Sequence, residues 1–309
     1  MSLSLSGLAD ARLRIAQQAF ATDDSRDILR FAVEALTSGR GAALVTLVEI
    51  RGGAARPLGA QMAVREDGLY CGFVSGGCVE AAAAFEAMEV IACGQDRSVR
   101  YGQGSPYFDI VLPCGGGITL AIHKLHSAQP LLAVLNSLEQ RRPAGLRYAP
   151  PSGTLRALTT LPTTGWDEAG FAVGYRPCVQ VIIGGDSLEA QATATLAQAA
   201  GYDVHLSDDG TPHPTDADTA VILLWHDLNR EVAILQAVRE TDPFYIGALG
   251  SQRTHLKRVA KLRELGWRQA EIERIKAPIG LFPQARDAQS LALSVLADVA
   301  ATRLRLRKA

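Results

Sequence analysis

The second half of the chain alternates short apolar runs with helical segments, and this alternation restricts the possible folds more than any other feature. The apolar runs lie at residues 179–183, 203–206, 219–224 and 244–249. Strands separated by helices form parallel sheets that are covered by helices on both faces. The sequence therefore predicts a Rossmann-like α/β domain, with a doubly wound parallel sheet, over residues 177–309.

The first half, residues 1–176, predicts a second α/β module with a different order of elements. We expect helices at residues 10–36 (interrupted at 22–25), 79–93 and 131–140. Strands are expected at residues 42–50, 61–65, 69–74, 98–101, 109–112 and 118–123. Prolines and glycines punctuate short strands after residue 141, which indicates a β-rich connector and a domain boundary near Pro177.

Composition excludes several classes of protein. A chain of 309 residues is long enough for two domains, and its formal net charge of −1 favours neither nucleic acid nor an anionic membrane as a partner. No apolar run approaches the roughly 18 residues that span a bilayer, and the N-terminus indicates no signal peptide. The five cysteines have no zinc-type Cys-x-x-Cys spacing. We therefore expect a cytoplasmic protein whose thiols stay reduced.

Residues 72–80, Gly-Phe-Val-Ser-Gly-Gly-Cys-Val-Glu, predict the end of a strand, a glycine turn and the start of a helix. Gly76 and Gly77 allow the backbone N–H groups of the turn to approach a ligand closely. Cys78 and Glu80 then fall in the first helical turn, whose partial positive charge attracts anions. Glu80 can cap this turn or act as a base.

A second cysteine stands beside glycines in Pro-Cys-Gly-Gly-Gly, where Cys114 precedes Gly115 and Gly116. Cys78 and Cys114 have three possible roles: small hydrophobic residues in the core, nucleophiles or soft-metal ligands, or the lining of a pocket for a sulfur-rich ligand. The adjacent glycines favour the second and third roles. The remaining cysteines are expected in the core: Cys71, Cys93 and Cys178. In a glycine-rich loop nearby, the guanidinium of Arg56 can bind an anion or remain solvated.

In the second module, Gly184 and Gly185 follow a strand and precede a helix, which is the layout of a dinucleotide-binding crossover. Asp208 lies 23 positions after Gly185, near the place where an acidic residue binds a ribose hydroxyl. However, the third glycine of the fingerprint is absent, and Asp186 places a negative charge where a pyrophosphate requires backbone N–H groups. Binding of NAD(P) or FAD and a Rossmann-like scaffold without a cofactor therefore both remain open.

Gly250, Ser251 and Arg253 form a second junction between a strand and a helix. The N–H groups of a helix start, together with a hydroxyl and a guanidinium, can bind a phosphate. The alternative is a tight turn in which Ser251 caps the helix. His226 follows another strand and is expected at the same edge of the sheet, where ligands bind in such folds.

Taken together, these motifs resemble those of the XdhC/CoxI family, the accessory factors that mature molybdenum hydroxylases such as xanthine dehydrogenase. The resemblance runs from about Ala42 to Ala301. It depends on these segments: Arg56-Pro57-x-Gly59 with Met62 and Val64, Ser75-Gly76-Gly77-Cys78-Val79-Glu80, Cys114-Gly115-Gly116, Tyr245-Ile246-Gly247-Ala248-Leu249-Gly250-Ser251, and Ala277-Pro278-Ile279-Gly280-Leu281.

The resemblance implies a chaperone without turnover chemistry of its own. Such a protein binds molybdenum cofactor (molybdopterin), protects it while its terminal sulfido ligand is installed, and delivers it to an apoenzyme. A cysteine desulfurase would supply the sulfur, and a molybdenum hydroxylase would receive the product. Cys78 and Cys114 are then expected next to molybdenum. The full set of expected cofactor-binding residues is Arg56, Ser75, Gly76, Gly77, Cys78, Glu80, Cys114, Gly115, Gly116, Gly184, Gly185, Asp208, Gly250, Ser251 and Arg253.

The chain departs from the usual family pattern at two places. Gly184-Gly185-Asp186 replaces a Gly-Ala-Gly turn, which weakens the case for a nucleotide. Residues 282–291 replace an Asp-Ile-Gly-Ala-type segment and an acidic Pro-x-Glu-Ile pattern, which indicates an altered ligand or partner surface. Two other functions remain open: an NAD(P)-dependent oxidoreductase that uses the Rossmann-like domain, and a thiol-based sulfur transferase that carries a persulfide on Cys78. A homodimer is also expected, through an apolar face left after two small domains pack.

Overall fold

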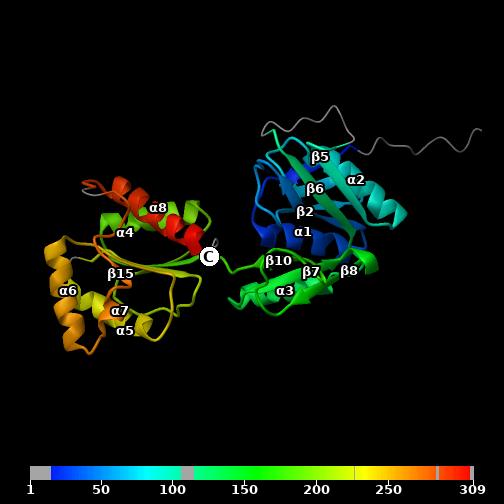
Figure 1. Ribbon diagram of the computed structural model, residues 1–309. Coiled ribbons are helices and arrows are strands. Elements are labelled where there is room, and N and C mark those ends of the chain that lie inside the picture. Colours follow the sequence, from blue (N-terminus) through cyan, green and yellow to red (C-terminus); the bar gives the residue numbers. More distant parts are fainter. Residues whose placement is uncertain (1–14, 106–114, 226, 283–284, 307–309) are drawn as a thin grey trace, which may run out of the picture. The chain divides into compact units, whose positions relative to one another are not determined.

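The computed structural model describes residues 15–105, 115–225, 227–282 and 285–306. The chain divides into two compact units, Met1–Pro177 (unit 1) and Cys178–Ala309 (unit 2), where the sequence predicts a boundary near Pro177. Figure 1 shows the helices and strands of each unit. No helix in the described part of the chain is long and apolar enough to cross a membrane.

Unit 1 is built on a six-stranded sheet, which we call the large sheet. Its strands, in order across the sheet, are β1 (Gln17–Phe20), β4 (Leu69–Gly72), β3 (Gln61–Arg65), β2 (Ala42–Arg51), β6 (Gly117–Lys124) and β5 (Arg97–Gly102). β1 and β4 pair in parallel, and the other neighbours are antiparallel. β2 and β6 are buried along most of their length, which matches their near-continuous apolar sequences.

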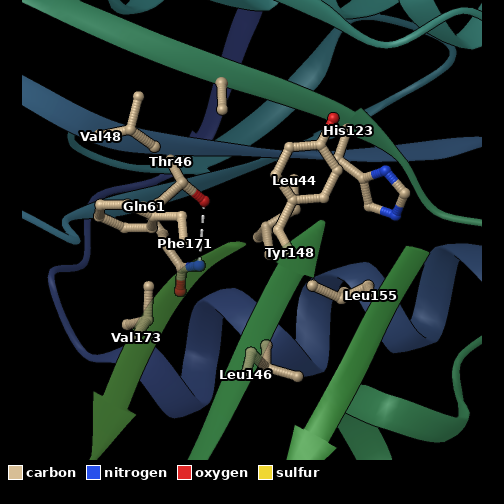
Figure 2. Close-up of a pocket in the computed structure, with 11 residues that line it drawn as sticks. Leu44, Thr46, Val48, Gln61, His123, Leu146, Tyr148, Leu155, Phe171 and Val173 are labelled. Carbon is tan, nitrogen blue, oxygen red and sulfur yellow. Dashed lines mark hydrogen bonds between the residues drawn. The ribbon is translucent and has the colours of Figure 1, made fainter. Parts of the chain in front are cut away.

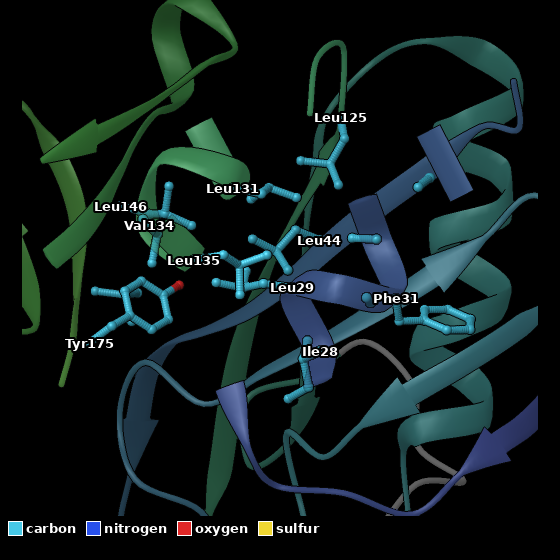
Figure 3. Close-up of a cluster of buried hydrophobic side chains, with 14 of the residues drawn as sticks. Ile28, Leu29, Phe31, Leu44, Leu125, Leu131, Val134, Leu135, Leu146 and Tyr175 are labelled. Carbon is cyan, nitrogen blue, oxygen red and sulfur yellow. The ribbon is translucent and has the colours of Figure 1, made fainter. Parts of the chain in front are cut away.

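Both faces of the large sheet are covered. Helix α2 (Glu80–Cys93) packs on one face. Helices α1 (Ser25–Thr37) and α3 (Gln129–Glu139) and a small antiparallel sheet pack on the other. The small sheet has the order β8 (Thr154–Leu158), β7 (Ala144–Ala149), β10 (Gly170–Tyr175) and β9 (Gly165–Asp167), with a 3₁₀ turn at Pro150–Ser152. Figure 3 shows how Leu29 of α1, Leu135 of α3 and Leu146 of β7 join Leu44 of β2 in one buried cluster.

The helix expected over residues 10–36 is only partly present. α1 begins after Asp24, whose carboxylate accepts a hydrogen bond from the Arg26 N–H at 2.8 Å and caps the helix. Gln17–Phe20 form strand β1 instead, so the prediction of a helix is wrong there. β1 pairs with β4 and satisfies backbone groups that would otherwise lie at the edge of the sheet. The strand expected at 109–112 lies outside the described residues.

Unit 2 contains the expected parallel sheet. Its strands, in order across the sheet, are β12 (Asp203–Ser207), β11 (Gln180–Gly184), β13 (Thr219–Leu223), β14 (Tyr245–Ala248) and β15 (Ile275–Lys276). One face is covered by α4 (Leu188–Ala199) and α8 (Ala288–Leu306), and the other by α5 (Leu228–Arg239), α6 (Gln252–Glu264) and α7 (Gln269–Ile272). The strand order reverses at β11, which has β12 on one side and β13 on the other.

A small cavity lies between the two sheets of unit 1, lined by apolar side chains together with Thr46, Gln61, His123 and Tyr148 (Figure 2). Nδ1 of His123 lies 2.7 Å from the Asp96 carboxylate, and the Tyr148 hydroxyl donates to the same carboxylate at 2.8 Å. This polar group ties the loop after α2 to one strand of each sheet.

The hydrogen-bonded group of Asp96, His123 and Tyr148 makes the stability of unit 1 depend on pH. Burial lowers the pKa of His123 below its ordinary value of 6.5, although the hydrogen bond to Asp96 acts in the opposite direction. As the pH falls, the unfolded chain therefore takes up this proton before the folded chain does. The contribution of His123 is fully present above about pH 6.5 and is lost as the pH falls toward the lower pKa of the folded state.

We expect the urea midpoint of unit 1 to fall between about pH 7 and pH 5, and to fall less in the variant His123→Gln. The variant His126→Gln removes an exposed histidine whose charge also lowers the pKa of His123, so it should reduce the decrease less than His123→Gln does. If the urea midpoint falls as much in His123→Gln as in the wild type, other titratable groups cause the decrease.

Candidate functional site

Three loops of unit 1 lie along the same edge of the large sheet, the edge formed by the ends of its strands. Arg51, at the end of β2, is opposite Gly117 at the start of β6, and Gly117 is opposite Gly102 at the end of β5. On the next strands, Met62 at the start of β3 is opposite Gly72 at the end of β4. We call the three loops that meet at this edge the site loops: residues 52–56, 73–79 and 115–116.

Glycines bring the site loops into contact. A Cβ atom added at Gly116 would stand 2.1 Å from the carbonyl oxygen of Gly53, so this approach requires glycine. A Cβ atom at Gly76 would lie 3.5 Å from the methyl group of Ala55. Gly77 and Gly115 are exposed, and among the described residues no atom beyond their chain neighbours lies within 4 Å of an added Cβ atom at either position. The fold thus brings together both glycine motifs that the sequence singles out, and leaves space beside two of the glycines.

Glu80 is buried, and its carboxylate organises the loop at 73–79. It accepts hydrogen bonds from the backbone N–H groups of Val74, Ser75 and Val79 at 3.1, 2.7 and 3.2 Å. The Ser75 hydroxyl donates to it at 2.8 Å. A buried carboxylate is stable only with such charge-assisted partners. The start of α2 has no side-chain cap hydrogen bond, so the cap considered for Glu80 is not observed, and the carboxylate points into the loop that precedes the helix.

Cys78 is exposed at the end of the turn that Glu80 holds. Its Sγ lies 3.4 Å from the Ser75 Oγ. Cys114, the second expected ligand, lies outside the described residues. Within the described part of the chain, no group of three or more histidine, cysteine, aspartate or glutamate side chains could hold a metal ion.

Arg56 connects two of the site loops through a hydrogen bond. Its Nε donates to the Ser75 carbonyl oxygen at 3.3 Å, and its Nη1 donates to the Asp23 carboxylate at 3.0 Å. The guanidinium carbon also lies 5.2 Å from the centre of the Phe73 ring. These contacts use much of the hydrogen-bonding capacity of the Arg56 guanidinium, which the sequence predicts either to bind an anion or to remain solvated.

The other described cysteines follow the expectation only in part. Cys71 on β4 is buried, and burial raises the pKa of its thiol to about 12. Cys93 is exposed and Cys178 is half-buried, so the prediction of core positions is wrong for Cys93 and only partly right for Cys178. Cys93 falls in the last turn of α2, off the helix face that buries Val90 and Ile91.

In unit 2, the expected nucleotide crevice lies between β11 and β13, where the strand order reverses. A Cβ atom added at Gly184 would stand 2.4 Å from the ring of Trp225, so this glycine accommodates a side chain of the protein itself. An added Cβ atom at Gly185 would lie 2.8 Å from the Ala190 side chain. Both glycines are therefore required for packing within unit 2, whether or not a ligand binds there.

The charges at this crevice oppose a pyrophosphate. Asp186, in the loop after β11, pairs with Nη1 of Arg230 in the first turn of α5 at 2.6 Å. Hydrogen bonding to Asp186 raises the pKa of Arg230, and the nearby charges of Asp227 and Asp208 act in the same direction. An anionic ligand would have to displace the Asp186 carboxylate and would meet these other carboxylates. The departure at Asp186 that is visible in the sequence thus has a direct electrostatic consequence.

The second junction in unit 2 behaves as a helix cap. The side-chain oxygen of Ser251 accepts a hydrogen bond from the Thr254 N–H at 3.3 Å, and Arg253 is exposed in the first turn of α6. Strand β13 separates β11 from β14, so the turns at Gly184 and Gly250 do not follow neighbouring strands. His226 lies outside the described residues.

The site loops also have a neighbour that the sequence pattern does not distinguish. Arg51 is the last residue of β2, and a Cβ atom added at Gly117 would lie 3.2 Å from its Nε. Arg51 lies between the glycines that follow it and those that precede β6. This position marks it as a candidate site residue only once the pairing of β2 with β6 is known.

Comparison with known families gives two matches. Residues 181–299 match the profile of the XdhC Rossmann domain, and residues 35–102 match the profile of the XdhC and CoxI family. A solved structure described as a xanthine dehydrogenase from Bacillus halodurans superimposes with a TM-score of 0.69 at 20% identity, over 90% of this chain and 96% of that one. At this identity, the likeness shows a common fold.

Two relatives come from Escherichia coli (strain K12). The chain is 68% identical over 291 residues to the molybdenum cofactor insertion chaperone PaoD, an alignment that covers 93% of this chain and 92% of that protein. It is 25% identical over 261 residues to the uncharacterized protein YqeB, an alignment that covers 83% of this chain and 42% of that protein.

Proposed function

The chain belongs to the XdhC and CoxI family, and from this premise we propose that it acts as a chaperone that inserts molybdenum cofactor into an apoenzyme. The observation that carries the proposal is the 68% identity, along 93% of the chain, to a relative that is named for this activity. Both halves of the chain match family profiles, so the likeness is not confined to one unit.

Within this proposal, the cofactor binds at the site loops of unit 1. Molybdenum cofactor combines a metal, a sulfur-rich pterin and a phosphate, so its site needs a soft atom, closely approaching backbone and positive charge. The exposed thiol of Cys78 is a soft ligand for molybdenum or sulfur. Among the described residues, no atom beyond their chain neighbours fills the space beside Gly77 and Gly115. The residues at this edge therefore fit the chemistry of the cofactor.

The finer parts of the proposal follow from the family resemblance. The chain would hold the cofactor while a cysteine desulfurase supplies the terminal sulfur, and the recipient would be a molybdenum hydroxylase of the xanthine dehydrogenase type. We propose that the chain does this in the cytoplasm and as a homodimer. The exposed thiol of Cys78 also suits a second role, a persulfide carrier that transfers sulfur without holding the pterin. An NAD(P)-dependent oxidoreductase has less support, because Asp186 occupies Arg230 at the crevice of unit 2.

The proposal is tested by anaerobic binding of purified molybdenum cofactor to the wild type and to Cys78→Ala. We expect stoichiometric binding by the wild type, and a loss of at least about tenfold in affinity in Cys78→Ala, the smallest loss usual when a residue that supports a metal site is removed. Cys93→Ala is the matched control, because it removes the exposed thiol at the other end of α2. Activation of an apo molybdenum hydroxylase should change in parallel.

Three outcomes would change this account. A wild type that binds no molybdenum cofactor would overturn the chaperone function. Full binding and full activation by Cys78→Ala would remove the role of Cys78 and leave the function in place. A persulfide on Cys78 in protein that does not bind cofactor would favour the sulfur carrier.

A further inference from the structure

Arg51 carries a guanidinium nitrogen without a partner at the edge where the site loops meet. Its Nη2 is buried, and no acceptor for it is found in the described part of the chain. Buried donors in native proteins nearly always have an acceptor, which can be a water molecule, an ion or a ligand. The side chain as a whole keeps 27% of its surface exposed, so Arg51 lies near solvent although Nη2 itself is covered.

The remaining nitrogens of Arg51 fix the direction of this donor. Nη1 donates to a carboxylate oxygen of Glu49 at 2.6 Å and to the Thr119 hydroxyl at 3.1 Å. Nε donates to the Gln103 carbonyl oxygen at 3.3 Å. Hydrogen bonds from Thr119 and Arg51 lower the pKa of Glu49, so its carboxylate stays ionised and holds the guanidinium. A donor that is held from β2, β6 and the turn after β5 loses little side-chain freedom when it binds a ligand.

Several of the described residues around Arg51 are glycines. An added Cβ atom would stand 3.2 Å from its Nε at Gly117 and 3.9 Å at Gly104. Gly52 follows it directly, and a Cβ atom there would lie 3.5 Å from the Cα atom of Gly116. A Cβ atom at Gly117 would also stand 2.4 Å from the Gln103 carbonyl oxygen, so glycine here is required by the turn after β5 and leaves room beside the guanidinium.

The local charge is positive. Glu49 interacts with Arg51 and also, at longer range, with Arg100, so one carboxylate faces two guanidinium groups. Arg56, at the other side of the site loops, is already bonded to Asp23 and to the Ser75 carbonyl oxygen. Three further described arginines have an unpartnered buried nitrogen, Arg147 on β7, Arg258 on α6 and Arg303 on α8, and none of these elements leads into the site loops.

We propose that Arg51 binds the phosphate group of the ligand at the site loops through Nη2. A guanidinium matches phosphate oxygens in geometry and charge, and it remains protonated at all relevant pH values. The inference rests on the proposed function for the identity of the ligand. It assigns the two ends of that ligand to different residues, with the metal or sulfur end at Cys78 and the phosphate end at Arg51.

The first test is a titration of the full chain with inorganic phosphate, followed by calorimetry. We expect saturable binding by the wild type and an affinity at least about tenfold lower in Arg51→Gln, which loses a charged hydrogen bond. Arg51→Lys should be intermediate, because lysine keeps the charge without the planar fork. Arg100→Gln, which removes the other arginine near Glu49, should bind nearly as well as the wild type. Circular dichroism checks that each variant is folded, and Arg51→Lys carries the test if Arg51→Gln does not fold.

The second test uses metal-free molybdopterin with and without its terminal phosphate. The wild type should prefer the phosphorylated form, and Arg51→Gln should lose that preference while Cys78→Ala keeps it. Equal phosphate affinity in the wild type and Arg51→Gln, or no saturable phosphate binding by the wild type, would overturn the inference and assign Nη2 to a water molecule. If phosphate binding depends on Arg51 but molybdenum cofactor does not bind the wild type, the proposed function fails and the phosphate site stands.

Discussion

The variant Arg258→Met should lower the unfolding free energy of unit 2 by about 3–5 kcal/mol, the usual cost of leaving a buried charge without its partner. Nε and Nη2 of Arg258 donate to the two carboxylate oxygens of Glu231 at 2.6 and 2.9 Å. The side chains are 2% and 1% exposed. Nη2 also donates to the Leu249 carbonyl oxygen at 2.8 Å, so the pair connects α5 and α6 to the segment after β14. Methionine fills much of the arginine volume but leaves the Glu231 carboxylate buried without a counter-charge.

The pH dependence of this loss separates an unpaired charge from poor packing. Burial raises the pKa of Glu231, and the hydrogen bond from Arg258 opposes that rise. Without Arg258, Glu231 takes up a proton at higher pH, and the neutral acid is cheaper to bury. The stability deficit of Arg258→Met should therefore shrink as the pH falls. A deficit that is independent of pH would assign the effect to packing.

Urea denaturation followed by circular dichroism measures the effect, with Arg263→Met on the exposed face of α6 as a control that should stay within about 0.5 kcal/mol of the wild type. The double variant Glu231→Leu/Arg258→Met should recover most of the loss, because well-packed apolar residues often replace a buried ion pair at little cost. A single variant as stable as the wild type would contradict the role assigned to this pair.

The regular elements of the fold could be predicted because their signals are local. Asp24, Ser251 and Gly94 act as helix caps, and each stands next to the residues that it caps. The strands at β1 and β15 were not predicted, because they are short and their backbone is ordered by pairing with β4 and β14. Their sequences carry little periodicity of their own, so the decisive information lies in distant parts of the chain.

The candidate site could be predicted as a set of motifs but not as an arrangement. Adjacent glycines and a cysteine identify the loop at 73–79 from the sequence alone. The contact between Gly116 and Gly53 depends on the register of β2 against β6, which no local pattern specifies. Arg51 and Arg56 look alike in the sequence, since both stand in the same glycine-rich segment. Only the fold shows that Arg56 is bonded to Asp23, whereas Arg51 retains a buried donor without an acceptor among the described residues.

The variant Glu80→Gln should weaken both the fold of unit 1 and the binding of molybdenum cofactor, although Cys78 stays intact. Glu80 accepts four hydrogen bonds within its own loop, from three backbone N–H groups and the Ser75 hydroxyl. Glutamine has one acceptor oxygen, and its NH₂ group would face donors at the second position. We expect a loss of about 2–4 kcal/mol in unfolding free energy, because charged hydrogen bonds are lost and a buried donor is left unpaired. Urea denaturation measures it.

The same variant distinguishes a residue that positions the loop from one that contacts the ligand. If Glu80 acts by holding the turn, amide hydrogen exchange at Val74, Ser75 and Val79 should accelerate in Glu80→Gln before any ligand is added. The affinity for molybdenum cofactor should then fall about as far as in Cys78→Ala, because the thiol loses its fixed position. Glu89→Gln, at an exposed position on the same helix, should change neither quantity. Unchanged exchange at the three amides together with lost cofactor binding would mean that Glu80 itself contacts the ligand, and the loop at 73–79 would then need another source of rigidity.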